Sequence, residues 1–180
     1  MAEGVHLIET NKVLLDQGID VLSSISDAQY KHTNSKYYQS CIGKHMRHIL
    51  EHYMAFTASV SASRKIDYDD RKRDQQIEKS RSHAIQTAES MIGDLSRLGE
   101  DRMLSGQPIK VKNNENGSWV IDSWSGSSIE RELQFLISHT VHHYALIAII
   151  LRIQGIRPDE KFGIAPSTLR YRKQFNRSTG

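Results

Sequence analysis

Apolar side chains recur every three or four residues along four long stretches of the chain. A helix turns about 100° per residue, so this spacing places the apolar side chains on one face. It predicts four long helices, over Val5–Ser24, Ser40–Ala62, Gln76–Leu98 and from a Ser127-Ser128 cap to Gln154. Because no repeat, linker or low-complexity segment divides the chain, residues 1–180 are expected to form a single all-α domain, a four-helix bundle.

Polar segments connect the expected helices. Residues 26–38 are rich in Ser, Asn, Lys and Tyr and are expected to form a loop. Ser63–Asp74 carries charges of both signs, which is typical of a solvated connection with weak local ion pairs. A second interpretation of this segment is that Tyr68 or an aspartate folds over the mouth of a pocket. Beyond the fourth helix, Phe162–Arg172 is expected to add one short helix that begins near Pro166.

The pattern changes between the third and fourth helices. Ile109 and Val111 alternate with lysines, Asn116-Gly117 is a strong hairpin turn signal, and Trp119–Ile121 follows. We therefore expect a short β-hairpin inserted between these two helices. An isolated hairpin is marginally stable, so it should lie against the bundle or a partner chain.

The fourth helix carries two histidines at the centre of its apolar stripe, His139 and His143, four residues apart. Their side of the helix also carries Phe135, Leu136, Leu146, Ile147 and Ile150. Both nitrogens of a buried imidazole need partners, and two rings one turn apart compete for them. A divalent metal ion can take a lone pair from each ring. The spacing indicates a metal site, and the alternative is a pair of satisfied core histidines.

The second helix has three further histidines along one edge of its apolar stripe: His45, His48 and His52. At least one of them can turn towards the other two, and His45 is nearest the stripe by angular position. The same pattern is expected to turn the charged side chains of this helix outwards: Lys44, Arg47 and Glu51. On the fourth helix, the zinc-metalloprotease motif His-Glu-x-x-His would require a glutamate directly after His139. Thr140 stands there instead, so a metalloprotease site would lack its general base.

Composition excludes several classes of protein. The single cysteine, Cys41, excludes an internal disulfide framework and is expected to be an inert core thiol. With a net charge of +3, the basic residues are scattered apart from Arg71–Arg73 and the tail, which argues against a nucleic-acid binder. The first helix is amphipathic rather than a signal peptide, and the longest apolar run, Tyr144–Leu151, is shorter than a membrane span. A cytoplasmic protein is expected.

Two segments carry a family resemblance: Ile42-Gly43-Lys44-His45-Met46-Arg47-His48, and Ser138-His139-Thr140-Val141-His142-His143. Together they resemble the DinB/YfiT-like superfamily of metalloenzymes over nearly the whole chain. That superfamily is a four-helix bundle with one metal-binding histidine on its second helix and two, four residues apart, on its last long helix. The segments Ile66–Asp69 and Phe162–Tyr171 are similar to an uncharacterised subgroup of it.

The resemblance implies that His48, His139 and His143 bind the metal ion, which is zinc or nickel in this superfamily. His48 ends the run that begins at Ile42-Gly43 and is followed by Ile49 and Glu51, like the family's ligand on this helix. His45 is the competing choice and His52 the third. His142 points about 100° away from His143 and is expected beside the site or on the surface.

Three neutral imidazoles leave coordination positions open, as in catalytic rather than structural sites. The resemblance therefore implies a metal-dependent enzyme acting on a small molecule, either hydrolase-like or a transferase that uses a low-molecular-weight thiol. No residue is identified as a general base. The alternative is a non-catalytic binding or stress-response module in which the metal only stabilises the bundle.

The chain departs from the better-known members directly after the last ligand. Those members have Arg-Gly-Gln there, whereas this chain has Tyr144-Ala145-Leu146. Alanine and leucine cannot make the polar substrate contacts of glutamine and arginine, so the activities of those members do not transfer directly. The resemblance also implies a homodimer. Trp119 and Trp124 are candidate interface residues, and the alternative for both is packing in the core.

Overall fold

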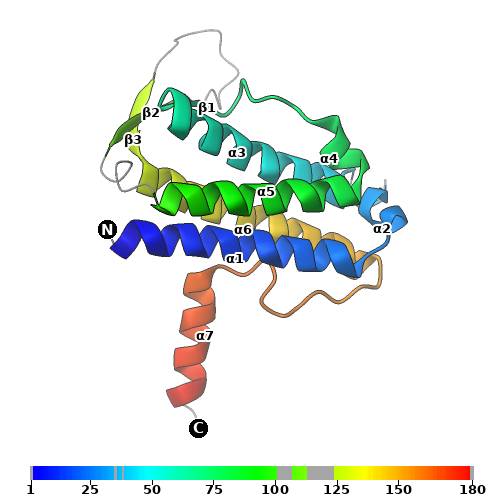
Figure 1. The fold of residues 1–180 in the computed structure, drawn as a ribbon. Coiled ribbons are helices and arrows are strands. Elements are labelled where there is room, and N and C mark those ends of the chain that lie inside the picture. Colours follow the sequence, from blue (N-terminus) through cyan, green and yellow to red (C-terminus); the bar gives the residue numbers. More distant parts are fainter. Residues whose placement is uncertain (1, 35, 38, 101–106, 113–123, 179–180) are drawn as a thin grey trace.

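Four long helices lie side by side in the computed structural model, which describes residues 2–34, 36–37, 39–100, 107–112 and 124–178 (Figure 1). They are α1 (Ala2–Ser24), α3 (Ile42–Ala62), α5 (Arg81–Glu100) and α6 (Ile129–Ile153). Both α1 and α3 pack against α5 and α6, so apolar side chains of all four helices meet in one core. The predicted four-helix bundle is confirmed.

The helices begin and end close to the predicted positions, for recognisable reasons. Ser128 caps α6, because its side chain accepts a hydrogen bond of 3.2 Å from the backbone N–H of Arg131. Gly155, just beyond α6, has φ +80°, a conformation that favours glycine. The last helix, α7 (Pro166–Ser178), begins at the predicted proline, continues past Arg172 and projects away from the bundle (Figure 1).

The prediction of a loop over residues 26–38 is wrong for its first part. Asp27–Lys31 forms the short helix α2, closed by a capping box in which Ser26 and Gln29 exchange hydrogen bonds. Tyr30 is fully buried and donates a 2.6 Å hydrogen bond to the carbonyl of Ile77. This contact fixes α2 against the segment that precedes α5.

The third predicted helix is two helices. Ser80 adopts an extended backbone conformation between α4 (Gln75–Lys79) and α5. The short helix α4 packs closely on the first turn of α3, where a Cβ atom on Gly43 would lie 2.3 Å from the carbonyl oxygen of Glu78. The break at Ser80 thus lets α4 cover α3 while α5 follows the bundle.

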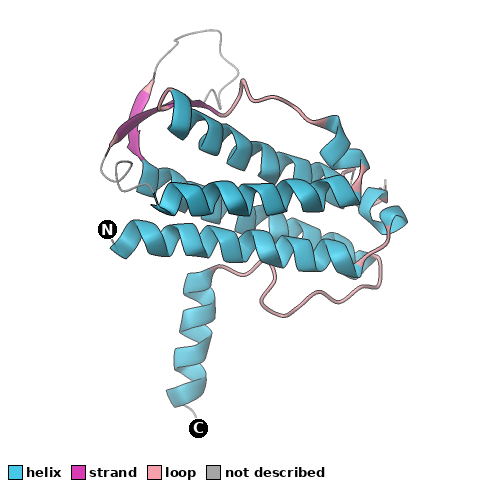
Figure 2. Ribbon diagram, in the orientation of Figure 1, coloured by secondary structure: helices cyan, strands magenta, loops and turns pink. Residues whose placement is uncertain are grey.

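A small sheet closes one end of the bundle (Figure 2). Its strands are β1 (Lys65–Asp67), β2 (Pro108–Lys112) and β3 (Ser125–Ser128), in the order β1-β2-β3. The central strand β2 pairs in parallel with β1 and antiparallel with β3.

This sheet corrects two predictions. An antiparallel strand pair does lie between the last two long helices, and the partner of β2 in it is β3. The expected turn at Asn116-Gly117 and the expected second strand at Trp119–Ile121 lie outside the described residues. The Ser63–Asp74 connection is not simply a solvated loop, because it contains β1 and buries Ile66 and Tyr68.

Helix α6 is more apolar as a whole than its longest uninterrupted run suggested. Within the described part of the chain, it is the one helix long and apolar enough, by length and composition, to cross a membrane. Its buried side chains face α1 and α3.

Candidate metal centre

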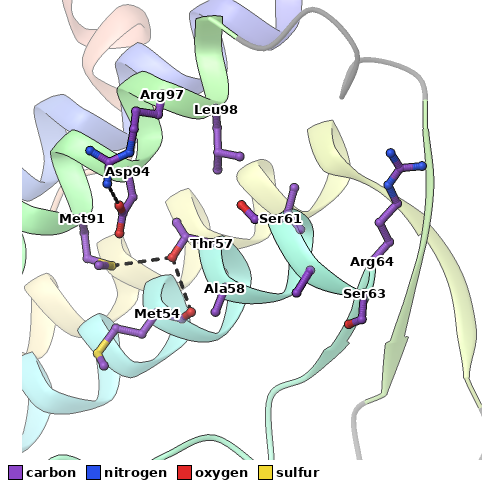
Figure 3. A pocket seen from close by; sticks show the side chains of 12 residues that line it. Met54, Thr57, Ala58, Ser61, Ser63, Arg64, Met91, Asp94, Arg97 and Leu98 are labelled. Atoms are coloured by element: carbon purple, nitrogen blue, oxygen red, sulfur yellow. Dashed lines mark hydrogen bonds and ion pairs between the residues drawn. The ribbon is translucent and has the colours of Figure 1, made fainter.

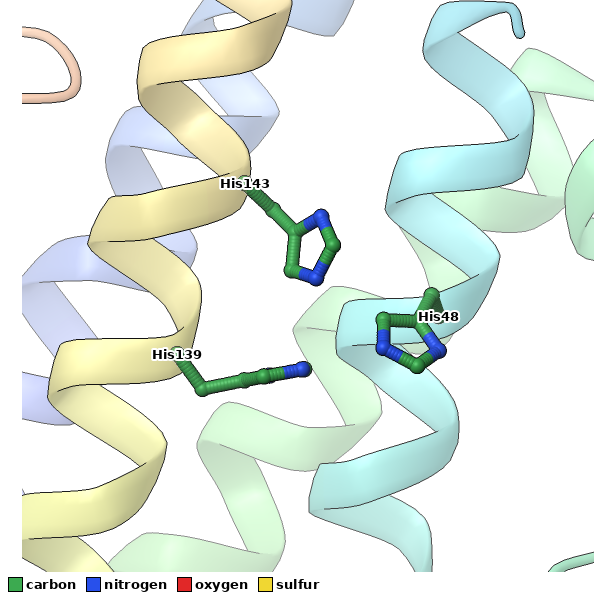
Figure 4. A group of neighbouring side chains, drawn as sticks. All are labelled: His48, His139 and His143. Carbon is green, nitrogen blue, oxygen red and sulfur yellow. The ribbon is translucent and has the colours of Figure 1, made fainter. Parts of the chain in front are cut away.

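Three imidazoles meet in the space between α3 and α6 (Figure 4). His48 comes from α3, and His139 and His143 come from successive turns of α6. Each ring offers one nitrogen, and the three nitrogens lie within 4.8 Å of one another. The distances between ring centroids are 4.6 to 4.8 Å. The structure thus brings together the three residues that the family resemblance selected.

His139 and His143 lie beside the centre of the buried stripe of α6, not within it as expected. Thr140 and Tyr144 occupy that centre and are fully buried. The Tyr144 hydroxyl donates a 2.8 Å hydrogen bond to the carbonyl of Leu14. The two histidines are half-buried and face α3, which leaves their rings accessible to a ligand.

The two competing histidines of α3 flank the three-histidine cluster. His45 Nδ1 lies 3.1 Å from Nδ1 of His143, so one of these nitrogens donates to the other. The Nδ1–H of His52 donates to the backbone carbonyl of His48 over 2.7 Å, and its ring lies 4.1 Å from that of His139. His142 is exposed, as expected, at 5.1 Å from the ring of His143.

Burial keeps the three imidazoles uncharged. Burial, together with the smaller effect of neighbouring histidine rings, lowers the pKa of His139 to about 2, that of His143 to about 3 and that of His48 to about 4. An ordinary histidine has a pKa near 6.5. All three rings are therefore neutral at pH 7, and each keeps a lone pair for a ligand.

One ring nitrogen of the cluster lacks a partner. Nδ1 of His139 is buried and makes no hydrogen bond to the residues that the structure describes. Such an unpaired buried group costs about 1–3 kcal/mol. His139 is therefore not a satisfied core histidine, and the second interpretation of the His139–His143 pair fails for this residue.

The donor set suits a transition-metal ion. Neutral imidazoles bind zinc, nickel and copper, and do not discriminate strongly among them. Nitrogen ligands about 2.0–2.1 Å from a tetrahedral zinc would be about 3.3 Å apart. Since the nitrogens here are separated by up to 4.8 Å, the three rings would draw closer around an ion.

Charged residues that sequence reasoning placed on the surface surround His48. Glu51, expected to face outwards, is 1% exposed and accepts from Arg71 Nε at 3.2 Å. Its other oxygen lies 3.5 Å from Nε of Arg47, whose Nη1 also pairs with Glu78 at 2.7 Å. The outward prediction for Arg47 and Glu51 is wrong, because the segment around Arg71 covers this side of α3.

Tyr68, which the second interpretation of the Ser63–Asp74 connection placed over a pocket, packs against His52 beside the three-histidine cluster. Its ring stacks on that of His52 at 5.2 Å and lies 5.1 Å from that of Phe135. Its hydroxyl donates a 2.9 Å hydrogen bond to the buried carboxylate of Glu132, which also accepts from Ser127 at 2.6 Å. Tyr68 therefore ties the connection to the first turn of α6.

A cavity of about 940 Å³ lies elsewhere, between the carboxyl-terminal turns of α3 and α5 (Figure 3). Small and apolar side chains line much of it, and the Asp94–Arg97 ion pair lies at its edge. Thr57, at its wall, donates to the carbonyl of Tyr53 within its own helix. Because none of its lining residues is a histidine, this cavity lacks the chemistry of the cluster.

Comparison with known proteins identifies the family of the chain. No curated protein matches the chain. A model of the DinB family matches residues 1–161, which include helices α1 to α6 and all three histidines of the cluster. The chain therefore belongs to the DinB family.

Proposed function

We propose that His48, His139 and His143 bind a divalent metal ion, zinc or nickel, and that the protein is a metal-dependent enzyme acting on a small molecule. The observation that carries the proposal is the convergence of three neutral imidazole nitrogens from two helices within 4.8 Å. The unpaired Nδ1 of His139 supports the proposal, because an unpaired buried nitrogen lowers the stability of the bundle.

A bound ion would supply Lewis acidity, which activates water for hydrolysis or a thiol for transfer at neutral pH. The chain's own residues hold the rings in place for that chemistry. His45 can accept from Nδ1–H of His143 and thereby leave the other nitrogen of His143 free for the ion. The ring of Phe135 stacks on that of His139, and the ring of Tyr68 stacks on that of the flanking His52. We propose a hydrolase-like enzyme or a thiol-dependent transferase.

One observation favours a second candidate function, a non-catalytic module that the metal stabilises. Tyr144 takes the place of the arginine that follows the last ligand in better-known members, and it is buried in the core and stacked on Phe162 at 4.5 Å. It therefore presents no polar group to a substrate. A protein of this kind would use the bundle for binding or in a stress response, without turnover.

Elemental analysis of the purified protein and of His139→Ala and His143→Ala variants tests the metal site. We expect one equivalent of metal in the wild type, and loss of it in both variants. His142→Ala is the matched control, because this exposed histidine on the same helix should leave the metal content unchanged. Stoichiometric metal in His139→Ala or His143→Ala would refute the site.

Thiol addition and chelation separate the two candidate functions. With Co²⁺ in the site, a change of the visible spectrum on adding a small thiol would show an open coordination position and support the enzyme. Unfolding on chelation, with a spectrum that no thiol changes, would support the structural module.

We further propose a cytoplasmic homodimer with a small-molecule substrate and no nucleic-acid partner. Cys41 is free and buried, which suits a reducing compartment. Val5 and Val13 on α1 and Tyr171 and Phe175 on α7 are exposed apolar side chains that a second copy would cover. Sedimentation equilibrium tests the dimer, and a salt titration of DNA affinity tests the absence of nucleic-acid binding.

A further inference from the structure

Arg71 joins the buried carboxylate of Glu51 to His48. Its Nη2 lies 3.0 Å from Nδ1 of His48, and its Nε lies 3.2 Å from Glu51 Oε2. Its Nη1 donates to the backbone carbonyl of Tyr68. The side chain is 13% exposed, so these three contacts hold the guanidinium against the bundle beside the histidine cluster.

The contact with His48 fixes where that ring carries its hydrogen. A guanidinium only donates hydrogen bonds and stays protonated in proteins. Nδ1 of His48 must therefore accept, and a neutral ring then carries its hydrogen on Nε2. In this arrangement neither nitrogen of His48 has a lone pair free for another partner.

Metal binding and the Arg71 contact each require a lone pair on His48, and a neutral imidazole has only one nitrogen with a lone pair to offer. An ion on Nε2 would require the hydrogen to move to Nδ1, where it would face a second donor at 3.0 Å. An ion on Nδ1 would take the lone pair that Arg71 uses. Figure 4 shows one nitrogen of His48 turned towards the other two rings and one turned away from them. For either nitrogen, the two partners exclude each other.

We infer that Arg71 and the metal ion are mutually exclusive partners of His48, so that loading the site releases the Arg71 guanidinium from this ring. The inference rests on the proposed metal site and adds a residue that regulates its occupancy. Arg71 belongs to the connection that contains β1 and Tyr68, so its release from His48 would affect the segment that packs against His52 beside the cluster. The Arg71 contact uses the lone pair that an ion would need.

Arg47 provides a matched control. It lies 3.5 Å from the other oxygen of the same Glu51 carboxylate and also pairs with Glu78. Its guanidinium makes no hydrogen bond to a histidine of the cluster in the described contacts. Replacing Arg47 or Arg71 by glutamine removes one positive charge beside Glu51, but only Arg71→Gln removes the competitor for His48.

The test measures zinc affinity of the wild type, Arg71→Gln and Arg47→Gln by competition with a chromophoric chelator. A hydrogen bond from a charged donor is worth enough that its removal should tighten zinc binding by about tenfold in Arg71→Gln. In Arg47→Gln the affinity should change by less than about threefold. Equal affinities of all three proteins for zinc would overturn the inference and leave the metal site standing.

A measurement on the wild type needs no variant to fold. Long-range ¹H–¹⁵N spectra of the histidine rings report which nitrogen carries the hydrogen. We expect His48 to carry it on Nε2 in the metal-free protein, and zinc to change that pattern and shift the Arg71 side-chain signals. A hydrogen on Nδ1 before zinc is added, or Arg71 signals that zinc leaves unchanged, would overturn the inference. Absence of zinc binding in all three proteins would overturn the metal site itself, and the inference with it.

Discussion

The Nδ1 atoms of His45 and His143 lie 3.1 Å apart, so one of the two rings donates a hydrogen to the other. If His143 binds a metal ion through Nε2, its Nδ1 carries the hydrogen and His45 must be the acceptor. His45, the alternative to His48 as a metal ligand, can thus act as a hydrogen-bond partner of a ligand instead. It can fix the tautomer and the orientation of His143.

Replacing His45 by phenylalanine should therefore weaken metal binding without removing it. Loss of the partner of a ligating histidine typically lowers metal affinity by about 10- to 100-fold. Chelator competition with zinc measures the change. His142→Phe is the control, because the His142 ring also contacts that of His143 but, among the described contacts, makes no hydrogen bond to it. If His45→Phe bound no zinc at all while His48→Ala still bound it, His45 would be the ligand.

The lowered pKa values of the cluster predict how metal binding depends on pH. The pKa is about 4 for His48, about 2 for His139 and about 3 for His143 in the folded protein, so these rings carry no proton at pH 6. Zinc should then displace almost no protons from its ligands, and its affinity should begin to fall only as the pH approaches 4.

Calorimetric titration at pH 6, in two buffers of different ionisation enthalpy, counts the protons released. Three histidines with the ordinary pKa near 6.5 would release about two protons at this pH. A count near zero is the expected result. A count near two would show that the cluster is protonated in solution and that burial does not hold the rings neutral.

The histidine pair of α6 was predictable from the sequence, because residues four apart on a helix share a face whatever surrounds them. The third member was not predictable from spacing. His45, His48 and His52 all lie along one edge of α3, and the packing of α3 on α6 decides which ring meets the pair. Family resemblance selected His48, which angular position alone disfavoured.

The surroundings of His48 could not be predicted from a local pattern. Glu51 lies on a side of α3 that is polar in sequence, and it is buried because Arg71 and the backbone N–H of Asp74 cover it. Those residues follow β1, which pairs in parallel with a strand some 40 residues later, and no short-range signal encodes such a pairing. The helix α2 is a different case, since its Ser26–Gln29 capping box was visible in the sequence.

His139 should reduce the stability of the metal-free protein at acidic pH. Its pKa is near 6.5 in the unfolded chain and about 2 in the folded protein, so the unfolded chain alone binds a proton between these values. The free energy of unfolding of the metal-free protein is therefore not reduced by this group above about pH 6.5, and it decreases as the pH falls below that value. Between pH 7.5 and 5.5 this loss amounts to about 1 kcal/mol.

The variant His139→Leu removes the titrating group and the unpaired nitrogen together. Urea unfolding of the metal-free protein at pH 7.5 and 5.5 should show a smaller difference between the two pH values for the variant than for the wild type, with zinc binding lost. An unchanged difference would mean that His139 is protonated in the folded state or has found a partner there.

Two glycines in long helices should respond oppositely to alanine. In α3, a Cβ atom on Gly43 would meet the carbonyl oxygen of Glu78 at 2.3 Å, so Gly43→Ala must push α4 away from α3. Overpacking of this kind costs about 1–3 kcal/mol. In α5, a Cβ atom on Gly93 would come no closer than 3.7 Å to the flexible side chain of Arg97, and alanine there should stabilise the helix by up to about 1 kcal/mol. Urea midpoints that move in opposite directions are expected. Because the connection that carries Arg71 and Asp74 to Glu51 leads directly into α4, Gly43→Ala should also loosen this connection. A urea midpoint for Gly43→Ala at or above that of the wild type would show that α4 does not pack on α3 as described.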